Sequence, residues 1–555
     1  MCFSLSLSLS LSLSLSLSLS HVFVSTNQFR GFGVLQSDIL AWRRILNEVA
    51  VVTPVDKRKS DLAISCPCCW QKRTHALVYG TGGKVVHSLI KWPIMRVLLH
   101  DAQEEYRYSG VSFPSVDSHR FGAIDAWPKI SNLAEKCRPL GSYYCHCLAP
   151  LFSVACRAIN FMISLLCPGN LSVACASSVV EKFHTFNLDV EDWLRRGYRP
   201  KFVPFKRDIE NFFNNNPRNL IRKALRWLVS EWYAHHGNRR KYIAIPKFPR
   251  GNNAFRESPQ CFSRAWKGHF RNLAKASCAK PGARVSRSVA SDFFVIHVDH
   301  ILPIVEFDLE HGLLYFGRRL FCPTIGMTQG SNLSPGVCNA VCVYLERQFC
   351  SVPPSIRTNS IHHLSWLLNR WVDDIFGVLC FWLLPGSDID ESAISSRADG
   401  VLESLSDVYS RVIHTRIVRK APAAGLRLKV EDAGDFVGFN VRFGRLISLS
   451  PQIRNHSLLC ASSSALPFPR FQHWHANRPL CEKLGSIQGL LVQVVDRCLN
   501  VSVADHVAPL LLELLVLEYP LCAVKTAIHR VCRSHPYLKP DLMCALQRVS
   551  AQTHL

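Results

Sequence analysis

Residues 370–378 read Arg-Trp-Val-Asp-Asp-Ile-Phe-Gly-Val, and this stretch decides the fold more than any other in the chain. Two adjacent acids, Asp373 and Asp374, stand between apolar runs at Leu367–Leu368 and Ile375–Leu384. Apolar runs on either side of a short polar break predict a β-hairpin with the acids at its tip. A divalent ion such as Mg²⁺ takes carboxylate oxygens and relieves their repulsion, so the tip is a candidate metal site. The alternative is a solvated turn that happens to hold two acids.

A third acid follows a short apolar segment upstream. Residues 201–207 read Lys-Phe-Val-Pro-Phe-Lys-Arg and lead into Asp208, which predicts a strand with this acid at its C-terminal end. Asn216 and Pro217 then form an N-cap residue followed by a proline at the first helical position. Apolar residues recur at helical spacing beyond them, so a helix is predicted from about Pro217 to Tyr233.

A turn-rich loop lies between these two acidic segments. Residues 326–335 read Gly-Met-Thr-Gln-Gly-Ser-Asn-Leu-Ser-Pro, and Ser334 with Pro335 is typical of a helix start. The apolar face of the helix predicted after this loop consists of Val337, Val341, Tyr344 and Leu345.

In their order along the chain, these segments resemble the palm of reverse transcriptases over roughly residues 180–443. Asp208 followed by two aromatic residues looks like the family's motif A, residues 326–335 look like motif B, and Trp371–Asp374 looks like motif C. Asp435–Phe439 resembles the hairpin called the primer grip. The sequence of residues 370–376 is similar to that of the corresponding segment in non-retroviral retroelement enzymes, including the Penelope-like group.

The resemblance implies a fold and a reaction. The fold is α+β, a right hand with fingers, a palm built on an antiparallel sheet, and a helical thumb. The reaction is RNA-directed DNA synthesis, in which a primer 3′ end is extended with deoxynucleotides by two-metal phosphoryl transfer. Two Mg²⁺ ions about 4 Å apart, with Mn²⁺ as an alternative, would activate the attacking hydroxyl and stabilise the leaving pyrophosphate.

The resemblance also assigns roles to single residues. Asp208 and Asp373 are expected to bridge the metals, Asp374 to support them, and Ile209 to offer its backbone carbonyl. Phe213 is expected to pack under the sugar of the incoming nucleotide, where a flat ring clashes with a ribose 2′-hydroxyl and favours deoxynucleotides. The alternative is that Phe213 belongs to an ordinary alternation of core and surface aromatics. Further contacts to nucleotide, template or primer are expected at Gln329, Gly330, Lys429, Phe436 and Gly438.

The composition agrees with nucleic-acid partners. The chain of 555 residues holds 65 Lys and Arg against 41 Asp and Glu, a formal net charge of +24. A basic chain of this kind is typical of proteins that follow a phosphate backbone, although ribosomal proteins share this property. We expect an RNA template, a DNA primer and deoxynucleoside triphosphates as partners. We found no continuous run of 18 apolar residues, so we expect no membrane partner, and we expect an intracellular, nuclear protein that is not secreted.

The domain organisation follows from the motifs. Residues 1–25 contain a strict Ser-Leu alternation that reads as translated simple-sequence DNA, and 26–153 are poorly specified. Residues 154–443 are expected to form fingers and palm, and 444–555 a helical thumb-like region.

Three alternatives stay open. The chain is either a working polymerase or a decayed or domesticated copy that binds nucleic acid without turnover. The intact Asp208, Asp373, Asp374 and Gln329 favour the first, and Trp371, where the family more often has tyrosine or phenylalanine, favours the second. A minor alternative is an HNH-type nuclease, because His297, Asp299 and His300 resemble the first strand of that family. Finally, Cys66, Cys68, Cys69 and His75 form a local cluster that is either a zinc site or a set of incidental reduced thiols.

Overall fold

The computed structural model describes only part of the chain. The described residues are 50–55, 58–68, 70–72, 92–116, 121–129, 132–143, 146–173, 175–209, 212–213, 216–237, 241–246, 293–316, 319–323, 326–351, 361–386, 391–410, 428–431, 435–436, 438–452, 471, 474–475 and 479–553. The predicted Ser-Leu repeat and two members of the cysteine cluster, Cys69 and His75, lie outside them. Within them helices and antiparallel strands are mixed, as an α+β chain predicts.

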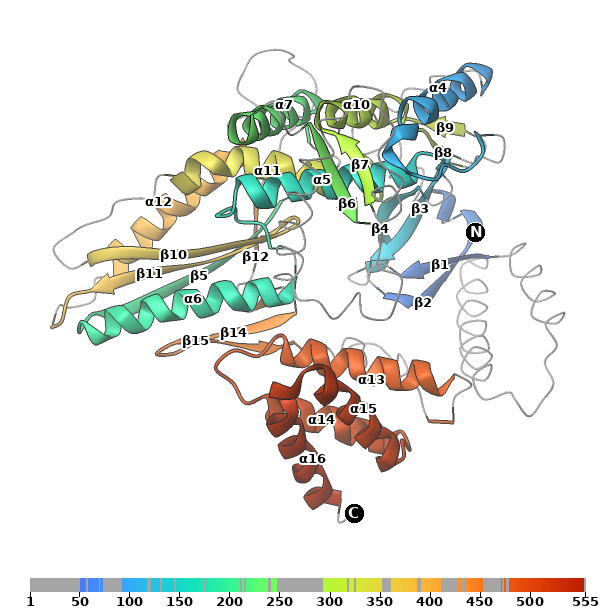
Figure 1. Ribbon diagram of the computed structural model, residues 1–555. Coiled ribbons are helices and arrows are strands. Elements are labelled where there is room, and N and C mark those ends of the chain that lie inside the picture. The colour runs from blue at the N-terminus through green and yellow to red at the C-terminus, as the bar shows by residue number, and fades with distance from the viewer. Residues whose placement is uncertain are drawn as a thin grey trace, which may run out of the picture.

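A four-stranded antiparallel sheet carries the acidic segments. Its order is β10 (Ile361–Trp371), β11 (Asp374–Leu383), β5 (Arg199–Ile209) and β12 (Leu428–Glu431). The predicted hairpin is therefore confirmed as β10 and β11, and the predicted strand before Asp208 is confirmed as β5. Strands from distant parts of the sequence lie side by side in this sheet (Figure 1).

Strand β11 is buried along almost its whole length because both faces of the sheet are covered. Ile375, Leu379 and Phe381 face one core with helices α11 (Ser334–Ser351) and α12 (Glu391–Ser410). Their neighbours along the strand face a second core, which includes helix α6 (Ala176–Arg195) and strands β14 (Phe439–Phe443) and β15 (Ile447–Pro451). Position 377 on this strand has room only for glycine, because a Cβ there would lie 2.2 Å from the Phe205 ring.

A helical layer packs above the sheet in Figure 1. It contains α5 (Ala149–Leu166), α7 (Arg218–His236) and α10 (Ile301–His311), with α11 shared between this core and the sheet. The helix predicted from about Pro217 is thus confirmed as α7, but its N-cap is Pro217 and not the predicted Asn216, whose side chain instead donates to the Phe212 carbonyl. The layer is completed by α4 (Trp92–Glu105), the 3₁₀ turns Arg107–Ser109 and Val298–His300, and the hairpin of β6 (Tyr242–Pro246) and β7 (Phe293–His297).

Among the described residues, helix α5 is long and apolar enough to cross a membrane by length and composition. It is not an unbroken apolar run, because Ser153, Arg157 and Asn160 interrupt it. More than half of the helix is buried inside the described structure, against α7, α10 and α11, as is usual for a core helix. It also runs across the boundary predicted near residue 153.

Smaller sheets flank the helical layer. One has the order β4 (Asn132–Ser142), β3 (Gly122–Lys129), β8 (Leu314–Phe316) and β9 (Arg319–Phe321), in which β3 and β8 run parallel. A separate hairpin is formed by β1 (Val51–Val55) and β2 (Arg58–Ser65). The end of β4 matters for the site because Gly141 contacts the loop that precedes α11.

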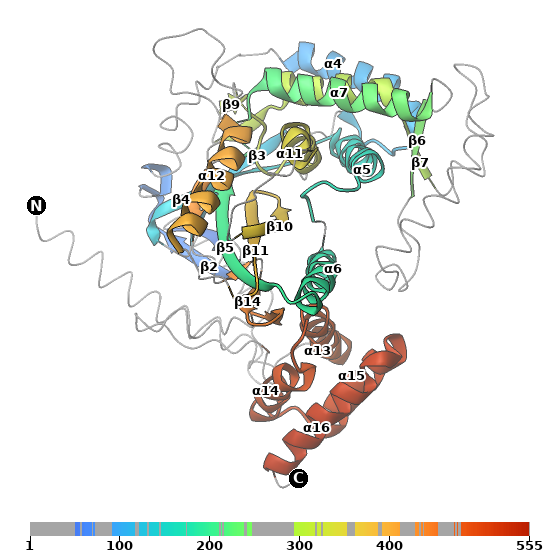
Figure 2. The same ribbon diagram turned by 90° about the vertical axis from the view of Figure 1, so that its left-hand side faces the viewer.

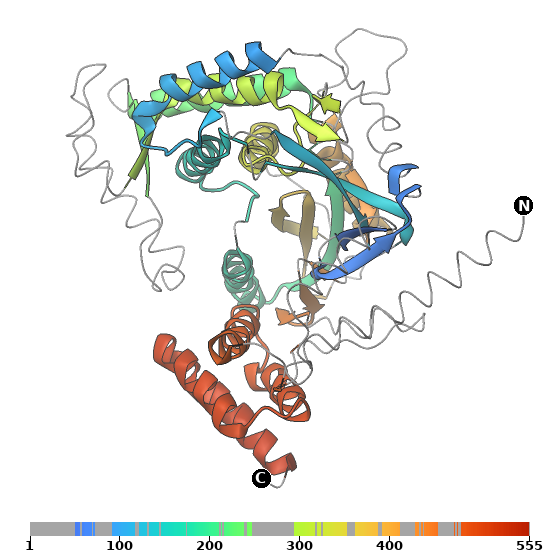
Figure 3. The same ribbon diagram turned by 90° about the vertical axis from the view of Figure 1, so that its right-hand side faces the viewer.

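The C-terminal residues form a helical bundle with its own core. Its helices are α13 (Leu480–Val495), α14 (Val503–Val516), α15 (Leu521–Ser534) and α16 (Lys539–Thr553), with a 3₁₀ turn at Pro536–Leu538. The apolar helical runs read from the sequence near Leu484 and Leu510 are therefore confirmed as helices. The bundle lies at the opposite end of the molecule from α7 and α10, with the sheet between them (Figures 2 and 3).

Candidate active site on the central sheet

Asp208 and Asp374 lie directly opposite each other on neighbouring strands. They are Cα partners in the ladder between β5 and β11. Paired residues of antiparallel strands project to the same face of the sheet, with Cβ atoms about 5 Å apart. The alternation along β11 places this face on the side of α6 and β14, because Phe376 and Val378 belong to that core. Two acids separated by most of the polymerase-like region of the sequence are therefore neighbours.

Asp373 occupies the turn between β10 and β11. Trp371 pairs with Asp374, so the loop has two residues, Val372 and Asp373. Val372 has a φ of 59°, a left-handed conformation that two-residue hairpin loops need but that usually falls to Gly, Asn or Asp. The carbonyl of Asp373 accepts a hydrogen bond from the Ile209 N–H at 2.9 Å. This bond fixes the turn against the end of β5, so the turn and Asp208 form one unit.

The fourth strand adds Lys429 to the same row. Its Cα partner in the ladder between β12 and β5 is Asp208. The row across the sheet is therefore Asp374, Asp208 and Lys429 at the level of the backbone. Sequence spacing alone predicted Lys429 only weakly, and the register places its backbone beside the acids.

The loop 326–333 is bound to this unit by its backbone. The Met327 N–H donates to the carbonyl of Phe213 at 2.8 Å, and the Gln329 carbonyl accepts from the N–H of Gly141 at 2.6 Å. Gly330 has a φ of 108°, and a Cβ there would lie 2.4 Å from the Gly141 carbonyl oxygen. These hydrogen bonds therefore connect the loop that holds Gln329 and Gly330 to Phe213 and to the end of β4. Glycine is required at 330 by both conformation and space.

The two aromatic residues after Asp208 differ in burial. Phe212 is buried in the core with α11 and α12, whereas Phe213 is half-buried at its edge. Their rings meet edge to face, with centroids 5.2 Å apart. The alternation of core and surface considered from the sequence is therefore present. The expected contact between the Phe213 ring and a nucleotide sugar stays a prediction.

The predicted primer-grip residues lie on the adjoining small sheet. Strand β13 (Asp435–Phe436) pairs with β14, and Gly438 turns between them with a φ of 81°. Phe436 is buried, with its ring 5.1 Å from that of Phe376 on the central sheet. This contact places the Gly438 turn on the same face of the central sheet as Asp208 and Asp374.

Asp308 is a polar residue of this region that sequence reasoning missed. It lies on α10 and is buried, and the Ser331 hydroxyl donates to its Oδ2 at 2.9 Å. Burial raises the pKa of Asp308 to about 6, although the bond from Ser331 works in the opposite direction. An available signal was its position on the apolar stripe of Ile301, Ile304 and Val305, where an acid is out of place.

The donor set suits a hard divalent cation. Asp208, Asp373 and Asp374 offer only oxygen atoms, which Mg²⁺ and Mn²⁺ prefer. Within the described ranges, however, no group of three or more His, Cys, Asp or Glu side chains is already arranged to hold a metal ion. The backbone brings the acids together, and metal binding would have to draw their side chains closer.

The nuclease alternative fares less well. His300 Nδ1 is hydrogen-bonded to the Tyr108 hydroxyl at 3.0 Å, and Asp299 accepts from the Tyr233 hydroxyl at 2.9 Å. These residues therefore form an aromatic cluster at the end of α7, and the metal-competent group that a nuclease needs is not found in the described part of the chain. The zinc alternative stays a prediction, because Cys69 and His75 lie outside the described residues; Cys66 and Cys68 are both exposed.

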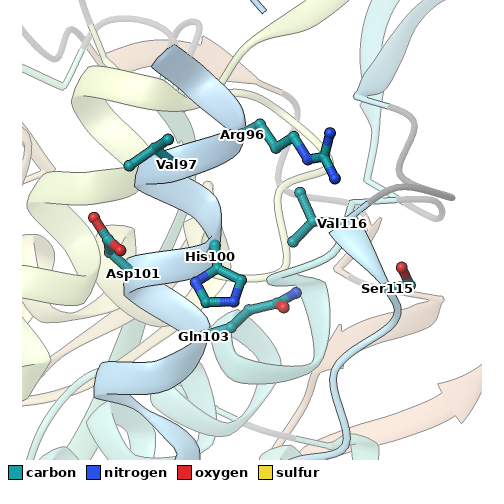
Figure 4. Close-up of a pocket in the computed structure, with 7 residues that line it drawn as sticks. All are labelled: Arg96, Val97, His100, Asp101, Gln103, Ser115 and Val116. Carbon is teal, nitrogen blue, oxygen red and sulfur yellow. The ribbon is translucent and has the colours of Figure 1, made fainter. Parts of the chain in front are cut away.

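A cavity of about 360 Å³ lies elsewhere, on the outer side of α4. Arg96, His100 and Gln103 line it from the helix, and Val116 closes it from the following segment (Figure 4). None of the residues predicted for the site lines this cavity, so it does not bear on the chemistry of the acids.

Comparisons with known proteins give a distant likeness. No protein-family model matches the chain, and no curated protein matches it. Among solved structures, it is similar to telomerase from Candida albicans in complex with the TWJ fragment of telomeric RNA, at 13% identity and a TM-score of 0.50, over 92% of this chain and 72% of that one. Apo telomerase from Candida tropicalis matches at 13% identity and a TM-score of 0.45, over 93% and 72%.

At such identity the first likeness shows the fold alone. The chain has a distant, reverse-transcriptase-like polymerase fold. Nothing in the comparisons assigns it to a retroelement family.

Proposed function

We propose that this protein is an RNA-directed DNA polymerase of retroelement origin that extends a primer 3′ end with deoxynucleotides. The observation that carries the proposal is the register of the central sheet. It places Asp208 opposite Asp374 and ties the Asp373 turn to Ile209. The distant likeness of the fold to telomerase, a reverse-transcriptase-related enzyme, supports the same class of reaction.

The acids would hold two Mg²⁺ ions, with Asp208 and Asp373 as the bridging ligands, Asp374 in support and the Ile209 carbonyl as a further donor. When bound, these ions would lower the pKa of the primer hydroxyl and neutralise charge that develops on the phosphates. The protein itself supplies position rather than covalent chemistry. The hydrogen bond between Ile209 and Asp373 keeps two of the ligand-bearing segments in register.

The remaining predicted residues would orient the substrates. Phe213 would select deoxynucleotides through its half-exposed ring, and Gln329 with Gly330 would contact the nucleotide or template. Lys429 would lie near the triphosphate, since its backbone pairs with Asp208. Phe436 and Gly438 would hold the primer on the same face of the sheet. In this proposal 326–333 and the helical layer act as fingers, the central sheet as palm and the C-terminal bundle as thumb.

The proposed partners are an RNA template, a DNA primer and deoxynucleoside triphosphates, in the nucleus. The formal net charge of +24 supports binding to a phosphate backbone. One of the similar telomerase structures contains telomeric RNA, which supports RNA as the partner class here.

Primer extension tests the proposal. The full chain would be given an RNA template, a DNA primer, Mg²⁺ and either deoxynucleotides or ribonucleotides, with Asp373→Asn as the matched variant. We expect extension with deoxynucleotides that falls by about 10²- to 10³-fold in the variant, because a proposed metal ligand loses its charge. Equal inactivity of both proteins, with RNA binding retained, would contradict the proposal and favour a decayed, binding-only copy.

A further inference from the structure

A fully buried ion pair lies directly beneath the turn that carries Asp373. Arg370 Nε donates to Glu346 Oε1 at 2.5 Å, and the two side chains are only 1% and 2% exposed. The buried Tyr409 hydroxyl donates to the same carboxylate oxygen at 2.5 Å. Arg370 Nη2 also donates to the side-chain oxygen of Asn339 at 2.9 Å. The cluster therefore joins β10, α11 and α12 through charged and polar side chains.

The same arginine reaches the turn itself. Its Nη1 donates to the Val372 carbonyl at 3.2 Å, and this carbonyl belongs to the peptide bond that leads into Asp373. The Arg370 backbone is also fixed, because its N–H donates to the Leu171 carbonyl at 2.7 Å and its carbonyl accepts from Val173 at 3.0 Å. Arg370 is thus held at its backbone and at its guanidinium, so the group that donates to the Val372 carbonyl is itself held in place.

The turn needs such support. Val372 is β-branched and has a φ of 59°, a strained combination that persists only where surrounding contacts impose it. The hydrogen bond from Arg370 is accepted by the carbonyl of this residue. A looser turn would let Asp373 move relative to Asp208, and metal ligands tolerate little displacement.

Stability alone does not explain the ion pair. Two charges removed from water contribute little net stability, and apolar residues of similar size often serve as well. Burial acts to lower the pKa of Arg370, but Cys342, Glu346 and Tyr409 outweigh it and the pKa is raised. The guanidinium therefore stays charged, and its planar fork fixes direction as well as distance. A turn that presents a metal ligand must hold the ligand in a fixed direction as well as at a fixed distance.

We propose that Glu346, Arg370 and Tyr409 are positioning residues that hold the Val372–Asp373 turn in the geometry that binds the divalent cation. The proposal rests on the proposed function for its effect on the reaction. Its effect on ion binding does not require turnover.

The test measures Mn²⁺ binding and catalysis separately. Mn²⁺ titration of the full chain, followed by electron paramagnetic resonance, would be compared for the wild type, Glu346→Gln and Tyr409→Phe. We expect folded variants whose Mn²⁺ dissociation constant rises by about 10-fold for Glu346→Gln and less for Tyr409→Phe, as changes to the residues that orient metal ligands typically do. In primer extension we expect kcat to fall, with the KM for deoxynucleotides changed by less than about twofold, because the lost contact acts on the reacting centre.

The control lies at the other end of the same hairpin. Ser365→Ala removes the hydrogen bond that the Trp382 Nε1 donates to the Ser365 hydroxyl at 2.9 Å, far from the turn. It should leave the Mn²⁺ affinity unchanged. An unchanged Mn²⁺ dissociation constant in Tyr409→Phe and in a folded Glu346→Gln would overturn the proposal, as would an equal loss in Ser365→Ala. If the wild type binds Mn²⁺ but does not polymerise, the proposed function fails. The titration would still show whether Glu346 and Tyr409 position the Val372–Asp373 turn.

Discussion

Asp308 is an acid in an environment that favours its neutral form. It is buried on α10, and its Oδ1 has no hydrogen-bond partner among the described residues, whereas its Oδ2 accepts from Ser331. Burial raises the pKa of its carboxyl group from 3.8 to about 6. The Tyr143 hydroxyl lies in the same pocket but also lacks a hydrogen bond of good geometry within the described structure. A neutral amide in place of the acid keeps one oxygen that can accept the hydrogen bond from Ser331.

The raised pKa predicts a pH-dependent effect of Asp308→Asn on stability. Between the unfolded pKa near 4 and the folded pKa of about 6, the folded state binds more protons than the unfolded state. The stability of the wild type therefore falls as the pH rises through this window, and the penalty is fully present above it. The neutral amide of the variant avoids the penalty, so we expect Asp308→Asn to gain about 1 to 3 kcal/mol relative to the wild type at pH 7.5, but little at pH 4.

Urea unfolding at pH 4, 5 and 7.5 measures this difference, and the control is compared between pH 5 and 7.5. Asp505→Asn is the control, because that exposed acid is paired with Arg548 and its pKa is lowered, mainly by the hydrogen bond from Arg548. Its stability contribution is present above the unfolded pKa and is lost only as the pH falls through the lower folded pKa. The free-energy difference for Asp505→Asn should therefore stay constant between pH 5 and 7.5. A difference for Asp308→Asn that does not change with pH would refute the assignment of a buried, proton-binding acid.

At the scale of elements, the loop 326–333 depends on close backbone contact with the end of β4. Gly330→Ala would place a methyl group 2.4 Å from the Gly141 carbonyl oxygen at a φ of 108°. Backbone cannot move aside as a side-chain tip can, so the loop must shift. We expect a loss of about 1 to 3 kcal/mol in unfolding free energy. We also expect a fall of about 10²-fold in primer extension, because small displacements of positioning groups are costly.

The matched control for this glycine lies in helix α12. Gly400 has open space around its Cα and a helical conformation, so Gly400→Ala should raise the unfolding free energy by up to about 1 kcal/mol. Opposite signs for the two substitutions, in unfolding measured by circular dichroism, would support the structural reading. An active Gly330→Ala protein would show that the loop is not held as the structure has it.

At the scale of the whole molecule, local pattern predicted the elements and long-range contact completed the site. The hairpin tip at Asp373, the strand end at Asp208 and a helix start beside Pro217 are encoded within a few residues, so the sequence predicted them, although it placed the N-cap one residue too early, at Asn216. The bond from Tyr409 to Glu346 joins residues 63 positions apart, and no periodicity reveals such a pairing. Sequence reasoning also had no means to set the register that opposes Asp374 to Asp208, because it depends on how distant strands meet.

The C-terminal bundle contacts the remaining structure near the turn at Gly438. Leu449 on β15 forms a bridge with Leu499, and the Asn500 side chain donates to the Ile447 carbonyl at 3.0 Å. Arg497 lies in the same junction, with its guanidinium 5.7 Å from the Phe439 ring, and a Cβ on Gly438 would come within 2.8 Å of its Nη1. Burial lowers the pKa of Arg497, yet its Nε has no hydrogen-bond partner in the described structure. This leaves a cation directed at the proposed primer-binding turn.

Arg497→Ala should therefore weaken binding of a primer–template duplex more than it weakens the fold. A phosphate on the primer would pair with the guanidinium, and each neutralised phosphate contributes about one unit to the dependence of log K on log salt. We expect that slope, measured by fluorescence anisotropy of labelled duplex between low and moderate salt, to fall by about 1 in the variant. Arg445→Ala is the control, since this exposed arginine lies in the turn at the far end of the β14–β15 hairpin and carries the same charge. An equal change of slope in both variants would mean that only net charge matters, and a duplex would then bind the basic surface without using the junction between sheet and bundle.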